Sequence, residues 1–199
     1  VINCGLYFDV GLTAVEGTHS IIIDITADLD VGDEIGIFDA NGILPSSTCD
    51  NIEYGELLVG AGVWTEDNQN GSSTLPILTI GSANLCEFEG GIYPGYQLNN
   101  NMIVKIFDQS RQEVFDVNIC SNPDDENCLG AVVGFGTATF NEIITVISEI
   151  NYEIVGCMNE SACNFDFEAN IDDGSCEYAL DNYDCDGSCV IEIDCAGVC

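Results

Sequence analysis

The balance of charge constrains this chain more than any other feature of its sequence. Its 199 residues include 35 Asp and Glu but only two basic residues, Lys105 and Arg111, so the formal net charge is −33. Almost no carboxylate can form an ion pair within the chain, and self-repulsion of this kind opposes a compact fold. Hydrophobic residues nevertheless make up 46% of the chain. We therefore expect a folded core beneath an anionic surface, with divalent cations neutralising part of the charge.

The same charge excludes two classes of partner. Binding to a phosphate backbone depends on Lys and Arg side chains that release counterions, and anionic membrane surfaces attract basic segments. No apolar run approaches the roughly 18–20 residues of a membrane-spanning helix. The sequence predicts neither nucleic-acid binding nor membrane insertion.

Cysteine is the second unusual component of the sequence. An even number of cysteines in an acidic chain predicts a disulfide framework formed in an oxidising compartment. The spacing of Cys185 with Cys189 and of Cys195 with Cys199 also fits a four-thiolate zinc site, although the interleaved acids favour a cation with oxygen ligands. A redox centre has less support, because no C-x-x-C pair occurs. The predicted disulfide cysteines are Cys4, Cys49, Cys86, Cys120, Cys128, Cys157, Cys163, Cys176, Cys185, Cys189, Cys195 and Cys199.

Residues 1–154 have the pattern of a β domain. Short segments rich in Ile, Val, Phe and Thr alternate with Gly, Asn and Asp, which predicts an all-β fold, specifically an antiparallel β-sandwich. A hairpin is expected around Gln109-Ser110-Arg111, and Trp64 is expected in the core. The predicted strands are 20–27, 34–39, 56–65, 75–81, 102–108, 112–119, 131–140 and 142–150.

Residues 155–199 differ sharply in composition from the rest. They contain seven cysteines, eleven acids and no base. A segment of this length buries little core, so disulfides or metal must stabilise it. We expect a small, loop-dominated, calcium-binding module. Because the two parts hold five and seven cysteines, complete pairing requires at least one disulfide that crosses the boundary or joins two molecules.

Acidic residues near turns provide two groups of candidate calcium ligands. The first surrounds Gly32, where alternating acids can direct several oxygens inward, although the full EF-hand spacing is missing. The second lies in the cysteine-rich part. In each case the alternative is an ordinary acidic turn on a solvated surface. The candidate ligands are Asp28, Asp30, Asp33, Asn164, Asp166, Asp172, Asp173, Glu177, Asp184, Asp186 and Asp194.

Catalysis has little support in the sequence. His19 is the only histidine, so any His-activated nucleophile must use it, and nothing local marks such a nucleophile. We expect His19 on the surface and no enzymatic activity. Asn70 and Asn159 each begin an N-x-S triplet, a candidate glycosylation site. A sugar-stacking platform is a further hypothesis, with the aromatic residues Tyr54, Trp64, Tyr93 and Tyr96.

The cysteine-rich part resembles a known repeat. The stretches GCMNESACNF (156–165), DDGSC (172–176) and YDCDGSC (183–189) are similar to an acidic cysteine-rich repeat of large secreted surface proteins of aquatic Gram-negative bacteria. The repeat loosely resembles thrombospondin type-3 calcium repeats. This resemblance implies calcium binding and a location outside the cell.

Parts of the β domain also resemble a known module. The stretches VGDEIGIFD (31–39), LVGAGV (58–63) and MIVKIFD (102–108) are similar to an extracellular β-sandwich module of the same kinds of protein. Relative to that module, residues 40–57, including Cys49, look like an insertion. Neither resemblance implies a catalytic activity.

Together these features predict a non-enzymatic, secreted structural or adhesive protein. We expect a calcium- and disulfide-stabilised repeating subunit of an extracellular filament or surface layer, joined head to tail. The apolar segment VINCGLYFDV (1–10) is expected to add to the sheet edge of a neighbouring copy. The alternative is a calcium-dependent carbohydrate-binding module of a larger surface protein, with glycans as partners. An extracellular hydrolase has the least support.

Overall fold

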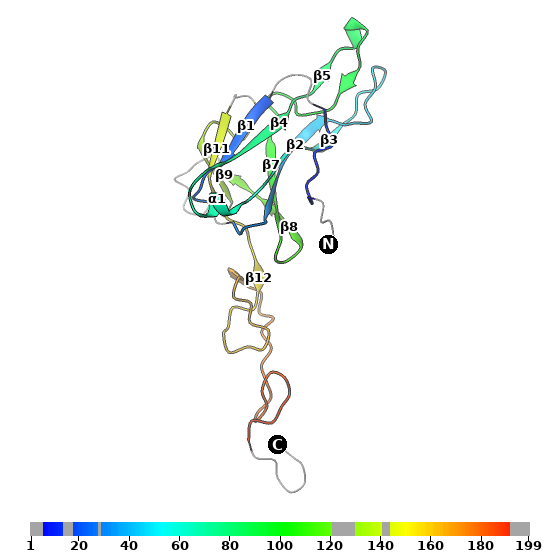
Figure 1. Cartoon of the computed structure of the whole chain (residues 1–199). Coiled ribbons are helices and arrows are strands. Elements are labelled where there is room, and N and C mark those ends of the chain that lie inside the picture. Colours follow the sequence, from blue (N-terminus) through cyan, green and yellow to red (C-terminus); the bar gives the residue numbers. More distant parts are fainter. Residues whose placement is uncertain (1–5, 14–17, 28, 121–129, 141–143, 192–199) are drawn as a thin grey trace, which may run out of the picture. The chain divides into compact units, whose positions relative to one another are not determined.

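The computed structural model describes residues 6–13, 18–27, 29–120, 130–140 and 144–191. The chain divides into two compact units, Val1–Tyr152 and Glu153–Cys199, and each is described here by itself. Among the described residues, no helix is long and apolar enough to cross a membrane. The protein is nearly all β, as predicted (Figure 1).

A four-stranded antiparallel sheet forms one layer of the first unit. Its strand order is β3-β2-β7-β8, and neighbouring strands pair antiparallel throughout. The turn between β7 and β8 contains Gln109, Ser110 and Arg111, so the predicted hairpin is confirmed. The strands are β2 (Glu34–Ile43), β3 (Tyr54–Val63), β7 (Met102–Asp108) and β8 (Glu113–Val117).

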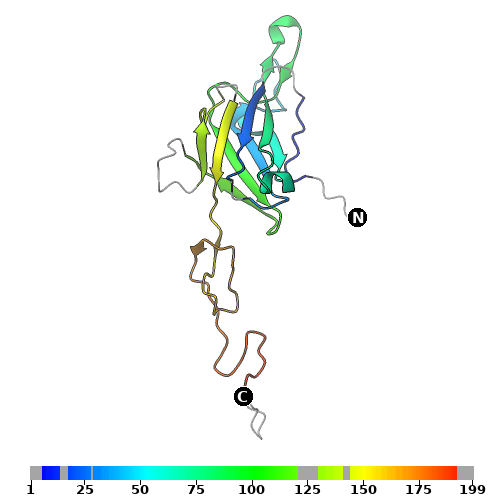
Figure 2. The ribbon, with the colours of Figure 1, turned by 60° about the vertical axis from the view of Figure 1, so that its left-hand side comes forward.

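A five-stranded sheet of order β4-β1-β11-β10-β9 forms the other layer (Figure 2). β1 is antiparallel to β4 but parallel to β11, and β10 is antiparallel to β11 but parallel to β9. The prediction of a purely antiparallel fold was therefore wrong for this sheet. β1 and β11 are far apart in the chain, so no local turn sets their relative direction. The strands are β1 (Thr18–Ile23), β4 (Leu75–Ile80), β9 (Ile119–Cys120), β10 (Ala131–Phe135) and β11 (Ile144–Ile150).

Short elements complete both units. In the first, a disulfide between Cys49 and Cys86 ties the loop between β2 and β3 to a two-stranded ribbon, β5 with β6. Residues 40–57 thus form the end of the β2–β3 hairpin and its loop. The remaining elements are β5 (Ala83–Asn84), β6 (Ile92–Tyr93), the 3-10 turn η1 (Cys86–Phe88), the helix α1 (Glu66–Gln69) and, in the second unit, β12 (Val155–Gly156) paired with β13 (Ile171–Asp172).

One apolar core lies between the two sheets. Alternate residues of the four-stranded sheet, such as Ile37 and Ile106, form a single buried cluster with Ile21 and Ile147 of the five-stranded sheet. This follows from the strand geometry, which directs every second side chain to the same face. Trp64 is only 1% exposed, so its predicted place in the core is confirmed.

His19 does not lie on the surface, and that prediction was wrong. Its side chain is 1% exposed because it points to the core, on the same face of β1 as Ile21 and Ile23. The Nε2 atom lies 3.0 Å from Oγ1 of Thr145, and the ring packs edge-on against Phe140. His19 is therefore one of the buried polar residues of the first unit.

Asp39 is a fully buried carboxylate that joins β2 to the loop before β7. Its Oδ1 accepts hydrogen bonds from the Asn41 main-chain N–H (2.8 Å) and the Asn100 amide (2.9 Å). Its Oδ2 accepts one from the Gln97 main-chain N–H at 2.7 Å. Hydrogen bonds to an ionised acceptor are short and strong, so they compensate the carboxylate for its lost hydration.

We expect Asp39→Asn to lower the free energy of unfolding by about 1–3 kcal/mol, because one acceptor oxygen becomes an N–H₂ donor that faces other donors. Urea unfolding with the disulfides intact measures the change. Asp50→Asn, at an exposed position, is the matched control and should change little. Equal stability of the two variants would show that the Asp39 hydrogen bonds contribute nothing.

Candidate functional site: the acidic disulfide-bonded module

Disulfides hold the second unit together. Cys157 pairs with Cys176 and Cys163 with Cys185, whereas the unit leaves large apolar side chains such as Phe167 (80%) and Leu180 (76%) exposed. Covalent links therefore replace most of the core, as expected for so short a unit.

All eight cysteines in the described part of the chain are disulfide-bonded, which confirms that part of the prediction. Besides the Cys49–Cys86, Cys157–Cys176 and Cys163–Cys185 pairs, Cys120 and Cys189 are also bonded. The zinc hypothesis was wrong, because Cys185 and Cys189 are not thiolates. The predicted disulfide residues Cys4, Cys128, Cys195 and Cys199 lie outside the described residues.

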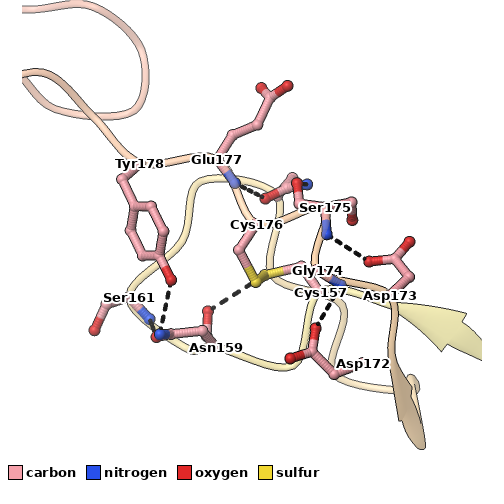
Figure 3. Close-up of a disulfide and its surroundings, with 11 residues drawn as sticks. Cys157, Asn159, Ser161, Asp172, Asp173, Gly174, Ser175, Cys176, Glu177 and Tyr178 are labelled. Carbon is pink, nitrogen blue, oxygen red and sulfur yellow. Dashed lines mark hydrogen bonds between the residues drawn. A yellow bond between two sulfur atoms is a disulfide. The ribbon is translucent and has the colours of Figure 1, made fainter.

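Carboxylates form the turns of this unit (Figure 3). In the first D-G-S-C loop, the Gly174 N–H donates to Oδ1 of Asp172 at 3.1 Å and the Ser175 N–H to Oδ1 of Asp173 at 2.8 Å. Side-chain acceptors of this type stabilise tight turns by replacing a backbone carbonyl. Gly174 adopts a φ of 69°, a left-handed conformation that glycine enters at little cost.

The second D-G-S-C loop is also shaped by an aspartate, but with a different set of hydrogen bonds. Oδ1 of Asp184 accepts hydrogen bonds from the main-chain N–H groups of Asp186 (3.1 Å) and Ser188 (2.7 Å). Gly187 adopts a φ of 76°, close to that of Gly174. The two loops thus share the left-handed glycine but not the hydrogen bonds of their carboxylates.

Other predicted ligands have similar local roles. Oδ1 of Asn164 accepts a hydrogen bond from the Glu177 N–H at 2.8 Å, and Nδ2 of Asn164 donates to the Ser175 carbonyl at 2.9 Å. Asp166 accepts one from the Glu168 N–H at 3.1 Å. In the described residues, no three Asp, Glu, His or Cys side chains are grouped to hold a metal ion. Calcium binding here stays a prediction.

Hydrogen bonds from Ser175 also shift the ionisation of Asp173. The Ser175 hydroxyl, followed by its main-chain N–H, lowers the pKa of Asp173 below its ordinary value. A lowered pKa in the folded state means that the ionised carboxylate stabilises the turn. This contribution is present above the unfolded-state pKa and is lost as the pH falls through the folded-state pKa.

We expect Ser175→Ala to raise the pKa of Asp173 toward its ordinary value, because the hydroxyl donor is removed while the main-chain donor remains. Titration of the side-chain carboxyl carbons by NMR measures this pKa. Ser188→Ala, at the equivalent position of the second loop, is the control and should leave Asp173 unchanged. A pKa of Asp173 that does not respond to Ser175→Ala would contradict the assignment.

The acidic turn before β2 is also fixed by hydrogen bonds. Asp33 is 1% exposed; its Oδ1 accepts from the Gln109 N–H (3.0 Å) and its Oδ2 from the Asp30 N–H (2.9 Å). Burial raises the pKa of Asp33, and the nearby Asp108 and Asp30 carboxylates raise it further. Asp33 therefore connects this turn to the β7–β8 turn. The third predicted ligand, Asp28, lies outside the described residues, as does Asp194 of the cysteine-rich part.

Both candidate glycosylation sites are exposed. Asn70 is the C-terminal cap of α1. Oδ1 of Asn159 accepts a hydrogen bond from the Ser161 N–H, and Nδ2 of Asn159 donates to the Tyr178 hydroxyl, each at 2.9 Å (Figure 3). Glycosylation at these positions stays a prediction.

The aromatic residues proposed as a sugar platform are not gathered on one surface. Trp64 and Tyr96 are 1% and 6% exposed, and the Tyr96 ring stacks on Phe140 inside the unit. Tyr54 is 48% exposed. An open pocket of about 490 Å³ does occur near the β5–β6 ribbon, lined by Ile43, Gly81, Ser82, Asn84, Tyr96, Gln97 and Leu98.

The outer face of the five-stranded sheet carries a set of residues that the sequence analysis missed. Its side chains alternate with those of the core, and register places Ser20 between Leu78 and Ile144. Leu78, Ile144 and Phe135 are 57%, 40% and 66% exposed. We call this set the uncharged sheet face; it consists of Thr18, Ser20, Ile22, Pro76, Leu78, Ile80, Phe135, Ile144 and Val146, and none of these residues carries a charge.

Comparison with known proteins gives no relative for this chain: no family model matches it, and neither does any curated protein or solved structure. The resemblances of the two units to secreted bacterial surface modules therefore stay predictions.

Proposed function

We propose that the protein is a non-enzymatic structural or adhesive subunit, secreted and assembled with copies of itself into an extracellular filament or surface layer. The observation that carries this proposal is the uncharged sheet face. Two copies with a net charge of −33 each repel one another. They approach at least cost through surfaces without charges, and exposed apolar patches typically mark protein–protein contacts.

The disulfides support the location. Disulfides form and persist in oxidising compartments and are rare in the cytosol. The three described pairs, Cys49–Cys86, Cys157–Cys176 and Cys163–Cys185, therefore indicate that the protein matures in an oxidising compartment. Secretion to the cell surface is the proposed destination. Outside the cell, a β-sandwich joined to a disulfide-bonded second unit is suited to a structural subunit.

Calcium is the proposed neutralising cation of the second unit. Residues 153–199 contain no Lys or Arg, and exposed carboxylates recur in both D-G-S-C loops. Calcium accepts monodentate carboxylates, amide oxygens, main-chain carbonyls and water together. A carboxylate that caps a turn with one oxygen is therefore still compatible with this ion. By screening the loops, calcium would stiffen the unit and lower repulsion between copies.

We expect Leu78→Asp to weaken self-association at least about 100-fold, because it places like charges opposite one another in the contact. Analytical ultracentrifugation measures the association constant, and circular dichroism verifies the fold. Phe88→Asp, at a side chain that is 80% exposed outside this face, is the control and should associate normally. Equal association of both variants would remove the uncharged sheet face from the assembly.

We expect native filaments to fray or shorten when calcium is chelated, since the acidic loops lose their counterions. Electron microscopy before and after chelation, and again after calcium is restored, measures this effect. Magnesium replacement is the control for simple charge screening. Particles that stay monomeric in calcium would contradict the proposed assembly.

A calcium-dependent carbohydrate-binding module is the second candidate function. The open pocket near the β5–β6 ribbon favours it, because Ser82, Asn84 and Gln97 line that pocket beside the exposed Leu98. Polar side chains next to an apolar surface are typical of small-ligand sites. A saturable glycan-binding isotherm from a monomeric protein would support this function over assembly.

A further inference from the structure

Tyr7 and Phe8 of the N-terminal segment lie on the face of the four-stranded sheet that points away from the core. Phe8 is 4% exposed, and its ring covers Gly36 of β2: a Cβ atom on Gly36 would lie 3.0 Å from the ring atoms Cδ1 and Cε1. The same ring packs edge-on against Phe38, with centroids 5.7 Å apart. Absence of a side chain at position 36 therefore creates the slot that Phe8 fills.

Glu34 binds the main chain of the same segment. This side chain belongs to a residue that is 6% exposed, and its two carboxylate oxygens accept hydrogen bonds from the N–H groups of Tyr7 and Phe8, each at 2.9 Å. Hydrogen bonds to a carboxylate are stronger than those between neutral groups. The Tyr7 ring stacks on Phe107 with centroids 4.3 Å apart. Glu34, Gly36, Phe38 and Phe107 form what we call the Phe8 pocket.

The sequence predicts that residues 1–10 add to the sheet edge of a neighbouring copy, and this stays a prediction. Within one chain, residues 6–13 form no strand, and Phe8 covers a sheet face. Tyr7 and Phe8 contact the outer face of the sheet through their rings and main-chain N–H groups, and Leu12 packs against the hydrophobic core. Leu6 and Tyr7 remain 58% and 56% exposed. Because residues 6–13 form no strand, the segment is separable from the sheet without breaking any strand pairing.

We propose that the Phe8 pocket is also the site at which one copy receives the N-terminal segment of the next. This inference rests on the proposed assembly and names its joint. The pocket already binds Tyr7 and Phe8 of its own chain, so the same segment from a second copy makes the same contacts. Exchange of an identical element is a low-cost route to association.

The geometry of exchange fits an open polymer. The donor segment and the acceptor pocket are different surfaces. Each copy therefore donates its segment at one surface and accepts the segment of a neighbour at another. Such head-to-tail contacts form an open polymer when the rotation between copies does not close a ring. At the joint, the incoming segment brings two N–H donors to the buried Glu34 carboxylate, while the acid of that segment, Asp9, is exposed.

Two variants separate exchange from an intramolecular contact. Phe8→Ala lacks the donor ring but keeps the pocket, whereas Gly36→Val keeps the donor but fills the slot, where even a Cβ lies 2.8 Å from the Phe38 ring. With Leu78→Asp added to each variant to remove the sheet-face contact, each variant alone should stay monomeric. Mixed together in that background, they should form heterodimers that stop there, because only one donor and one pocket remain intact. Native mass spectrometry with the disulfides intact measures the species.

The controls are matched to each variant. Phe88→Ala removes an exposed aromatic ring, and Gly91→Val adds a side chain where nothing lies within 4 Å; both should assemble like the wild type. Glu34→Gln is a second acceptor variant if Gly36→Val does not fold. A synthetic peptide of residues 5–13 should bind Phe8→Ala protein at 1:1, and the peptide with Phe8→Ala should bind at least about 100-fold more weakly.

The outcomes distinguish this inference from the proposed function. Filaments that persist in Phe8→Ala and Gly36→Val would overturn exchange and leave assembly in place. Heterodimers from the mixed variants, with no filaments of the wild type, would support exchange and overturn the filament. A mixture that stays monomeric and does not bind the peptide would show that the segment contacts only its own chain.

Discussion

Hydrogen bonds from main-chain N–H groups to carboxylates make this structure possible. The chain has only two basic residues for 35 acids, so ion pairs such as that of Asp108 with Arg111 compensate few of the acids that become buried. Asp33, Glu34 and Asp39 solve this problem in the same way, with both oxygens of each carboxylate accepting from main-chain N–H groups or a side-chain amide. Such charge-assisted bonds replace water as the partner of the charge. Each one also ties two distant parts of the chain together, which explains why acids occur inside an acidic protein at all.

Carboxylates that accept main-chain hydrogen bonds have a different role in each unit. In the first unit, capped carboxylates border an apolar core that supplies the main stabilisation. In the second unit, which buries little, carboxylates such as Asp172 and Asp184 shape turns while disulfides close the loops. An acid that shapes a turn looks the same in a sequence as an acid that binds a cation. The number of acids therefore cannot distinguish the two roles, and the orientation of their remaining oxygens becomes the deciding property.

The elements of this fold were predictable where local pattern determines them. Alternation in 102–108 predicted β7 to the residue, and the following turn predicted the hairpin, because both depend on near neighbours in sequence. The parallel pairing of β1 with β11 and the burial of His19 depend on segments that meet only in three dimensions. Disulfide partners belong to the same category, since spacing alone leaves every connectivity open. For the candidate site, sequence indicated the acidic loops and their repeat but not the hydrogen bonds that occupy their oxygens.

Self-association of such a chain must avoid its own charge, and the fold offers two surfaces that do so by different means. The uncharged sheet face has no charged residue, although the strands that form it come from three separate parts of the chain. The Phe8 pocket does contain a carboxylate, Glu34, but its charge is directed at donors that the docking segment itself supplies. A flat apolar face suits contact between equivalent surfaces, whereas a segment and a pocket impose direction. Together they would give lateral and longitudinal contacts that are separable by mutation, which is what a repeating extracellular subunit requires.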